Sequence, residues 1–339
     1  MKRLTLEEVG KLAGVSRATV SRVINNPEGV TPELRRRVER VIAETGYQPN
    51  LAARSLVSRR SNILGLIIPS VARFLFTDPY FPSLIQGISS ACNTNGYTLS
   101  LFLFNTREEE QQAYKRALGT GLIDGLIVTA EQMEAPFIPE LIERQIPFVY
   151  IGRPMHPERI SFVDVDNVGG AFTATNHLIQ LGCQRIATIG GPLSTAVGLD
   201  RREGYHKALT EHNMPVDENL MTFGDYSHDS GYTGMKRLLP HKPDAVFCAS
   251  DMMAVGALQA LHEAGLRVPD DVSVIGFDDL PPAVNAAPQL TTVRQPVQQC
   301  GLAAVETLID LLETGLEPPR HLIFQTELII RASCRALDA

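Results

Sequence analysis

Two short helices joined by a tight turn are predicted at the start of the chain, in the segment TLEEVGKLAGVSRATVSRVINN. Thr5 can accept a hydrogen bond from the backbone N–H of Glu8, and the Glu8 side chain can reach back to Thr5 as in a capping box. The first helix is expected to run to about Ala13. A glycine at position 14 then supplies the turn, so the segment is predicted to fold as a helical hairpin.

The second helix of this pair presents an open polar face. Ser16 is expected to cap it, and its apolar residues Val20, Val23 and Ile24 fall on one side. The residues left on the open face are Arg17, Ala18, Ser21 and Arg22. A helix-turn-helix places such a face, near the N-terminus of its second helix, in the DNA major groove. The alternative interpretation is an ordinary αα-hairpin within a protein core.

Charge separates the first sixty residues from the rest of the chain. The whole sequence has a formal net charge of −7, which by itself argues against nucleic acid as a partner. The first sixty residues nevertheless contain twelve Lys and Arg against six Glu, so they carry +6 and the remainder −13. This asymmetry indicates a basic nucleic-acid module joined to an acidic globular body. The run Arg35–Arg37 is either a solvated helix face or a phosphate contact.

A third helix and a short, weak helix are expected next. Thr31 caps the third helix, Pro32 occupies its first position and Gly46 ends it, while Leu34, Val38, Val41 and Ile42 form its apolar stripe. Asn50 is followed by LAARSLVSR, a segment that is too short to form a stable helix alone. We expect it to order only against DNA or a partner copy, with Leu56 beside Ala52 and Ala53. If this helix lies in the minor groove, Leu56 can insert between base pairs and kink the duplex. The alternative is that the helix only packs as a linker.

Several classes of protein are disfavoured by what the sequence lacks. The five cysteines are scattered without a CxxC pair, so buried free thiols are expected and neither a metal site nor a cofactor is predicted. No signal peptide or long apolar segment is evident, which favours a cytoplasmic protein without membrane association. The sequence has no GxSxG, GxxxxGK[ST] or HExxH motif, and Gly190-Gly191-Pro192 lacks phosphate-loop spacing, so an enzyme is disfavoured.

From residue 61 onward, apolar strands alternate with helical segments. ILGLIIPS, GYTLSLFLF, IDGLIVT, PFVYIG, RIATIGG, DAVFCAS and VSVIGFDD are the expected strands. Uninterrupted apolar strands that alternate with amphipathic helices predict parallel sheets covered on both faces. The segment is longer than one sheet usually organises, so two α/β subdomains are expected.

Polar residues follow several of these strands, where ligands of such sheets bind. They are Ser70, Thr129, Arg153, Ser250 with Asp251, and Asp278 with Asp279. Their carboxylates, guanidinium and hydroxyls suit a polyhydroxylated ligand in a cleft between two lobes. A single Asp after a strand is more often a helix cap, which is the interpretation of Asp166 and Asp251.

The segment EEVGKLAGVSRATVSRVINN, the connector YQPNLAARSL and the stretches IGFDD and TTVRQP resemble the LacI/GalR family of bacterial transcription regulators. The resemblance implies a homodimer that reads a near-palindromic operator in double-stranded DNA. It implies base-edge contacts from Arg17, Ala18 and Arg22 and phosphate contacts from Ser16, Thr19, Ser21 and Asn25. Leu56 would be the hinge wedge, and the remaining members of the expected DNA-binding set are Thr5, Asn50 and Ala53.

The resemblance also implies a two-lobed body like that of periplasmic binding proteins, with crossings near Ser161, Arg294 and Gln325. The implied domains are residues 1–47 for the head, 48–60 for the hinge, 61–160 with 295–325 for the N-terminal lobe, and 161–294 with 326–339 for the C-terminal lobe. The implied effector-binding residues add Arg201, Tyr226, Tyr80, Phe81 and Gln295 to those at the strand ends. The alternatives are that Tyr226 packs as a lobe-surface aromatic and that Arg153 only anchors a loop. Position 250 is Ser where many relatives carry Asn, and no ligand contact is assigned to Gly169.

The function expected from these observations is a repressor of carbohydrate-utilisation genes that a small, glucoside-like sugar releases from its operator. A regulator that needs a purine co-repressor or a phosphoprotein is the alternative, and a sugar receptor or an enzyme is the alternative from another class. No heptad repeat follows the last strand, so a dimer is expected to suffice.

Overall fold

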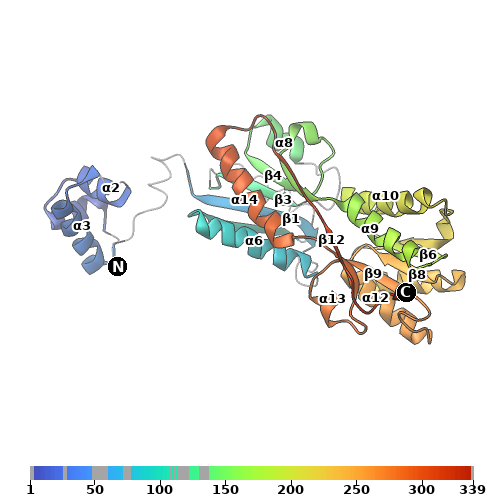
Figure 1. Ribbon diagram of the computed structural model, residues 1–339. Coiled ribbons are helices and arrows are strands. Elements are labelled where there is room, and N and C mark those ends of the chain that lie inside the picture. The colour runs from blue at the N-terminus through green and yellow to red at the C-terminus, as the bar shows by residue number, and fades with distance from the viewer. Residues whose placement is uncertain are drawn as a thin grey trace. The chain divides into compact units, whose positions relative to one another are not determined.

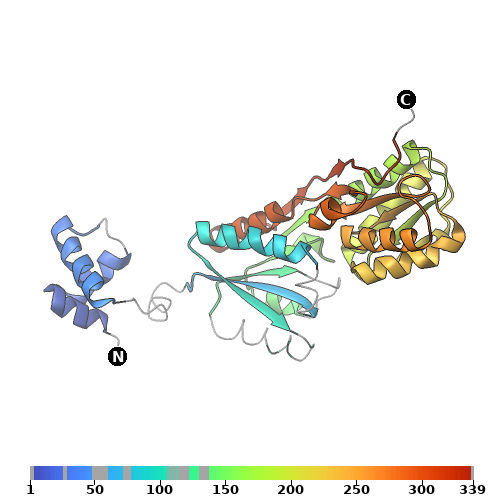
Figure 2. The ribbon, with the colours of Figure 1, turned by 90° about the horizontal axis from the view of Figure 1, so that it is seen from below.

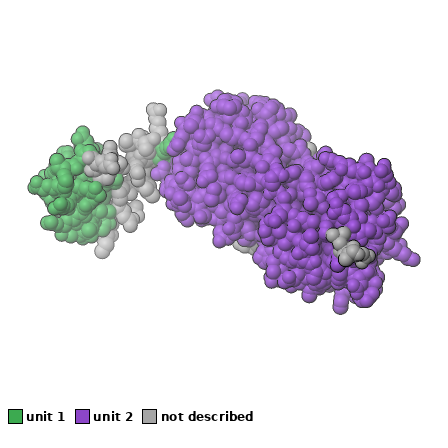
Figure 3. Space-filling view, viewed as in Figure 1, with its two compact units in different colours: residues 1–61 green, residues 62–339 purple. Residues whose placement is uncertain are grey.

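The computed structural model describes residues 4–25, 29–47, 60–71, 78–104, 106, 109, 112, 122–129 and 137–336. It contains two compact units, Met1–Ser61 and Asn62–Ala339, which Figure 3 shows in different colours. The predicted hinge positions Asn50, Ala53 and Leu56 lie outside the described residues. The same is true of the side chains of Asn25 and Ser70.

The first unit contains α1 (Leu6–Ala13), α2 (Arg17–Asn25) and α3 (Pro32–Thr45). The capping box that the sequence predicts is present, because Thr5 N donates to Glu8 Oε2 over 2.7 Å and Glu8 N donates to Thr5 Oγ1 over 3.3 Å. Ser16 caps α2 by accepting from Thr19 N over 3.1 Å. Both helix starts were therefore predicted correctly from side-chain capping.

The three helices of the head close over a small apolar core. Its buried members are Val9, Ala13, Val20, Val23, Val38 and Tyr47. The predicted apolar sides of α2 and α3 therefore face inward. Ser16, Arg17, Ala18 and Arg22 are exposed, while Thr19 and Ser21 are half-buried.

The arginine run in α3 is divided between different tasks. Arg37 Nη2 donates to the carbonyl of Ala13 over 2.8 Å and so satisfies a backbone acceptor at the C-terminal end of α1. Arg35 forms an ion pair of 2.7 Å with Glu39, four residues further along the same helix. All three arginines are exposed, as a solvated helix face predicts, and Arg37 in addition joins α3 to α1. A phosphate contact of the run stays a prediction.

The first lobe of the second unit is built on a parallel sheet of order β11-β5-β4-β3-β1-β2. Helices α6 and α14 lie side by side on one face of it (Figures 1 and 2). The elements are β1 (Ile63–Val71), α6 (Tyr80–Thr94), β2 (Thr98–Phe104), β3 (Gly125–Thr129), α8 (Ile138–Glu143), β4 (Phe148–Ile151), β5 (Phe162–Val165), α14 (Val297–Thr314) and β11 (His321–Phe324). Apolar clusters on both faces bury the central strands, as their uninterrupted apolar sequences predict, whereas the edge strands β2 and β11 are exposed or half-buried over most of their length.

The second lobe has a sheet of order β12-β10-β9-β8-β6-β7, in which only the edge strand β12 runs antiparallel to its neighbour among the described pairings. Helices α9 and α10 pack together against one face, and α11 and α12 pack against the other. The elements are α9 (Asn167–Gln180), β6 (Ile186–Gly190), α10 (Ala196–Glu211), β7 (Met221–Phe223), α11 (His228–Leu238), β8 (Ala245–Cys248), α12 (Asp251–Glu263), β9 (Ser273–Asp278), α13 (Pro281–Asn285), β10 (Thr291–Arg294) and β12 (Glu327–Ile329).

The chain crosses between the lobes at three places among the described residues. The first crossing follows Val165 rather than Ser161, because residues 162–165 still pair with β4 and β11 of the first sheet. The second lies between Arg294 and Val297, where β10 ends and α14 begins. The third lies between β11 and β12, at residues 325–326.

Within the described part of the chain, no helix is long and apolar enough to span a membrane. In the same residues, no group of His, Cys, Asp and Glu has the arrangement of a metal site. The five cysteines are buried and unpaired, as predicted. Burial raises the pKa of the Cys92 thiol to about 11 and that of the Cys300 thiol to about 12, so these thiols are poor nucleophiles.

Candidate functional site: the cavity between the lobes and the exposed face of the head

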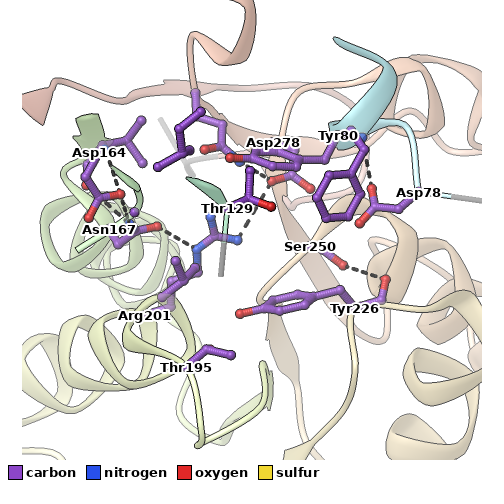
Figure 4. A pocket seen from close by; sticks show the side chains of 16 residues that line it. Asp78, Tyr80, Thr129, Asp164, Asn167, Thr195, Arg201, Tyr226, Ser250 and Asp278 are labelled. Atoms are coloured by element: carbon purple, nitrogen blue, oxygen red, sulfur yellow. Dashed lines mark hydrogen bonds and ion pairs between the residues drawn. The ribbon is translucent and has the colours of Figure 1, made fainter. Parts of the chain in front are cut away.

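A cavity of about 150 Å³ lies between the two lobes, at the carboxyl ends of the strands of both sheets (Figure 4). Both lobes and the second crossing contribute to it. The lining residues are Asp78, Tyr80, Phe81, Thr129, Ile151, Gly152, Asp164, Val165, Asn167, Thr195, Val197, Arg201, Tyr226, Ser250, Asp278 and Gln295.

Arg201 is a buried cation in this lining, with only 4% of its surface exposed. Its Nε donates to Asn167 Oδ1 over 2.9 Å and its Nη1 donates to the carbonyl of Ala249 over 2.5 Å. The guanidinium also stands 3.6 Å from the centre of the Phe277 ring, which gives a cation–π contact. These contacts hold the side chain in one geometry. A guanidinium fixed in this way can donate to a ligand oxygen without first being ordered.

Asp278 is the buried carboxyl closest to that cation. It is the last residue of β9, and its Oδ1 accepts from Gln295 Nε2 over 2.5 Å and lies 3.8 Å from Arg201 Nη1. Burial raises the pKa of Asp278 well above its ordinary value, and Arg201 opposes that rise. Its φ of 128° lies in a region that costs a non-glycine residue energy and that is concentrated at functional sites.

Asp164 is a second buried carboxyl in the cavity, and it was not predicted from the sequence. Its Oδ1 accepts from Val165 N over 2.8 Å and from Asn167 Nδ2 over 3.1 Å. Burial raises the pKa of Asp164 to about 6, although the Val165 hydrogen bond opposes the rise. Asn167, which links Asp164 to Arg201, was also missed. A carboxyl within the otherwise apolar strand FVDV was the signal that could have identified Asp164.

The lining from the first lobe includes Asp78, Tyr80 and Phe81. Asp78 Oδ1 accepts from Tyr80 N over 2.9 Å, and burial raises the pKa of Asp78. The Tyr80 and Phe81 rings meet edge to face with their centres 5.4 Å apart. Asp78 was not predicted, although it lies in the DPYF segment from which the two aromatic residues were selected.

Tyr226 supplies the aromatic ring on the second lobe. Its backbone has a φ of 68°, and its carbonyl accepts from the Ser250 hydroxyl over 3.3 Å. That hydroxyl also accepts from Met253 N over 3.2 Å and so caps α12. The Tyr226 hydroxyl is buried and makes no hydrogen bond of ordinary geometry among the described residues. Burial raises its pKa, and the neighbouring Arg201 and Thr195 side chains oppose that rise.

Arg153 lies outside the lining although the sequence places it in the effector site. Its guanidinium forms a two-point ion pair with Asp200 of α10, one bond of which measures 3.1 Å from Nε to Oδ2. The Asp200 carboxylate raises the pKa of Arg153 further. The pair joins the first lobe to the second beside the cavity, and a ligand contact of Arg153 stays a prediction.

The other predicted effector residues lie together in the lining. They are Tyr80, Phe81, Thr129, Arg201, Tyr226, Ser250, Asp278 and Gln295. The interpretation of Asp166 as a cap is confirmed, since it accepts from Gly169 N over 2.8 Å. That of Asp251 is wrong because Ser250 caps α12. Asp251 is buried and accepts from the Thr292 hydroxyl over 2.6 Å and from Leu280 N over 3.0 Å.

Two family models match the chain. Residues 5–50 match the model described as "Bacterial regulatory proteins, lacI family", and residues 175–334 match the periplasmic binding protein-like domain. The HTH-type transcriptional regulator CelR of Thermobifida fusca is 39% identical over 336 residues, which cover 98% of each chain. The chain belongs to the LacI family. Members of this family are DNA-binding transcriptional regulators, so the enzyme alternative is not supported.

Other members of the LacI family extend the comparison. The HTH-type transcriptional repressor PurR of Yersinia pestis is 36% identical, with 97% of this chain and 96% of PurR covered. The solved structure of a CelR–cellobiose complex matches with a TM-score of 0.78 and 38% identity over 98% of this chain and all of that one. The lac repressor dimer bound to operator and an anti-inducer matches with a TM-score of 0.87 and 28% identity, over 99% of this chain and all of that one.

Proposed function

We propose that this LacI-family regulator is a dimeric repressor of carbohydrate-utilisation genes and that cellobiose or a related glucoside releases it from its operator. The observation that carries the proposal is the chemistry of the cavity, in which hydrogen-bonding carboxyls, one fixed guanidinium and aromatic rings surround the same space. The solved CelR–cellobiose complex is a relative over nearly the whole chain and supports the choice of sugar.

The polar groups suit a neutral sugar. A carboxylate accepts hydrogen bonds from hydroxyls, and Asp78, Asp164 and Asp278 each have an oxygen to which no described donor is assigned. The Arg201 guanidinium beside them can donate to a ring or hydroxyl oxygen. Each sugar hydroxyl both donates and accepts, so it can satisfy carboxylates and the guanidinium in the same cavity.

The balance of charge disfavours an anionic ligand. The lining holds the buried carboxyls Asp164 and Asp278 and the half-buried Asp78, but a single guanidinium, since Arg153 is paired with Asp200. A phosphate group would add negative charge beside Asp164 and Asp278 in a poorly solvated space. The purine alternative has support from the PurR relative, and we treat it as the competing outcome of the experiment below.

The exposed residues of α2 in the head support the assignment of operator contacts. Arg17 and Arg22 project from α2 into solvent, where an arginine can form two hydrogen bonds with guanine O6 and N7. Ala18, which follows Arg17 in the sequence, is also exposed and can contact a thymine methyl group. We assign phosphate contacts to Ser16, Thr19, Ser21 and Asn25, and hinge contacts to Asn50, Ala53 and Leu56, while Thr5 acts through its cap.

The proposed mechanism couples two sites. The effector binds residues of both lobes and therefore stabilises one relative arrangement of them. Release of DNA requires that the effector bind the DNA-incompetent arrangement more tightly than the competent one. By linkage, operator DNA must then weaken effector binding by the same factor.

A thermal-shift screen tests the proposal. The purified protein is heated with cellobiose, glucose, hypoxanthine or guanine, each with and without a DNA duplex from the promoter of its own operon. We expect cellobiose to raise Tm and the duplex to reduce that shift, because the two ligands oppose each other. A purine whose shift is enhanced by the duplex would overturn the sugar assignment and favour co-repression.

A further inference from the structure

We propose that Gly191 sets the position of the Tyr226 ring and thereby the shape of the effector cavity. The inference rests on the proposed function, since it concerns the same site. The Gly190-Gly191-Pro192 segment lacks phosphate-loop spacing, and none of its residues lines the cavity. In the structure Gly190 is the last residue of β6, and Gly191 lies against the Tyr226 ring.

The contact that carries the proposal is steric. A Cβ atom built on Gly191 would lie 2.3 Å from Tyr226 Oη, 2.5 Å from Cζ and 2.6 Å from Cε1. Non-bonded carbon atoms pack at about 3.5–4.0 Å, so no side chain fits there while the ring keeps its place. Position 191 must therefore be glycine for the phenol to lie against the backbone.

The Tyr226 backbone cannot readily retreat from such a clash. It already has a φ of 68°, and Ser250 holds its carbonyl. The phenol hydroxyl, in contrast, lies near the Thr195 hydroxyl and makes no hydrogen bond of ordinary geometry among the described residues. The neighbouring Thr195 hydroxyl is engaged with Gly198 N and the carbonyl of Pro192, both over 2.9 Å. A methyl group at 191 would therefore displace the ring rather than the backbone.

The displaced ring has consequences for the ligand. Tyr226 forms part of the lining with Thr195, Arg201 and Ser250 (Figure 4). A change in the ring position alters both the aromatic surface and the place of the Tyr226 hydroxyl. Gly191 is thus a positioning residue, which acts on the effector only through Tyr226.

Gly190 offers a matched control. A Cβ atom there would lie 2.9 Å from Cδ1 of Phe223, a ring that is 39% exposed and absent from the cavity lining. Gly190→Ala therefore introduces the same methyl group one residue away and makes a clash with a different ring. We expect Gly190→Ala to bind cellobiose within about twofold of the wild type and Gly191→Ala to bind at least about tenfold more weakly.

Titration calorimetry with cellobiose on the full-length protein, together with a double-mutant cycle, tests the mechanism. If Gly191 acts through Tyr226, then Gly191→Ala adds nothing further in a Tyr226→Ala background. Equal binding by Gly191→Ala and the wild type would overturn the proposal. A full loss from Gly191→Ala in the Tyr226→Ala background would overturn it as well, because the glycine would then act by another route.

A readout without ligand separates this proposal from the choice of sugar. The protein is labelled with 3-fluorotyrosine, and the ¹⁹F resonance that Tyr226→Phe removes is assigned to Tyr226. Gly191→Ala must shift that resonance, whereas Gly190→Ala must leave it in place. A resonance that Gly191→Ala does not move refutes the proposal. If the wild type fails to bind cellobiose while the resonance moves as expected, only the choice of sugar fails.

Discussion

Arg153 in the first lobe forms a two-point ion pair with Asp200 in the second, beside the cavity that both lobes line. The Asp200 side chain is 7% exposed and the Arg153 side chain is 47% exposed, so the pair stands at the boundary between the interior and solvent. It connects the lobes without any effector. We infer that it favours the arrangement in which the two halves of the cavity face each other.

Loss of this ion pair is expected to weaken effector binding moderately. Arg153→Gln removes one contact between the lobes, and a partly exposed pair is worth about 0.5–1 kcal/mol, which corresponds to about two- to fivefold in Kd. Calorimetry with cellobiose measures the change. Asp200→Asn should have a similar effect, and the double variant should lose little more than either single one. Additive losses would show that the two side chains act separately.

The Asp164 carboxyl predicts a pH dependence of stability. Its pKa is raised to about 6 in the folded protein against about 3.9 when unfolded, so the protonated form is favoured by folding. The associated stability is fully present below about pH 4 and is lost as the pH rises through 6. Asp164→Asn should therefore gain stability relative to wild type between pH 4 and 7, by up to about 3 kcal/mol. Urea unfolding across that range tests this, and a constant difference at all pH values would contradict it.

Arg22 is expected to read a base rather than a phosphate. Arg22→Ala should relax specificity at one base pair of each operator half-site, with a loss of about 1–3 kcal/mol of discrimination. Binding to a set of operators that carry single base-pair substitutions measures this directly. Equal weakening on every sequence, with a reduced salt dependence, would identify Arg22 as a phosphate contact instead.

Arg37 is expected to stabilise the head rather than to bind DNA. Arg37→Ala removes the hydrogen bond to the carbonyl of Ala13 and should destabilise the head by about 1 kcal/mol. Amide hydrogen exchange in the full-length protein should become faster in α1 and α3. Arg36→Ala is the control, since among the described residues no hydrogen bond or ion pair is assigned to the Arg36 side chain. Unchanged exchange in Arg37→Ala, with a loss of DNA affinity, would assign Arg37 to phosphate.

Much of the fold was predictable because it depends on local patterns. The capping box at Thr5, the apolar sides of α2 and α3, and the alternation of apolar strands with helices all act over a few residues. The rule for strand ends selected Thr129, Ser250 and Asp278, which meet in the cavity because parallel strands bring their carboxyl ends together.

The remaining features depend on contacts between distant parts of the chain. Nothing near Arg153 indicates that its partner is Asp200, which lies 47 residues away in the other lobe. Likewise, the acceptor of Arg37 lies 24 residues earlier, so the arginine run could be interpreted only as a charged surface. The carboxyl of Asp164 was overlooked because its neighbours form an apolar strand. Its burial near Arg201 makes it a candidate effector-binding residue.

The central claim is that cellobiose and operator oppose each other on this protein. Fluorescence anisotropy of a labelled operator duplex, titrated with protein at several fixed cellobiose concentrations, measures that coupling. We predict that saturating cellobiose weakens operator binding by at least about fivefold, and that operator weakens cellobiose binding by the same factor. Operator affinity that is unchanged or increased by saturating cellobiose would contradict the claim.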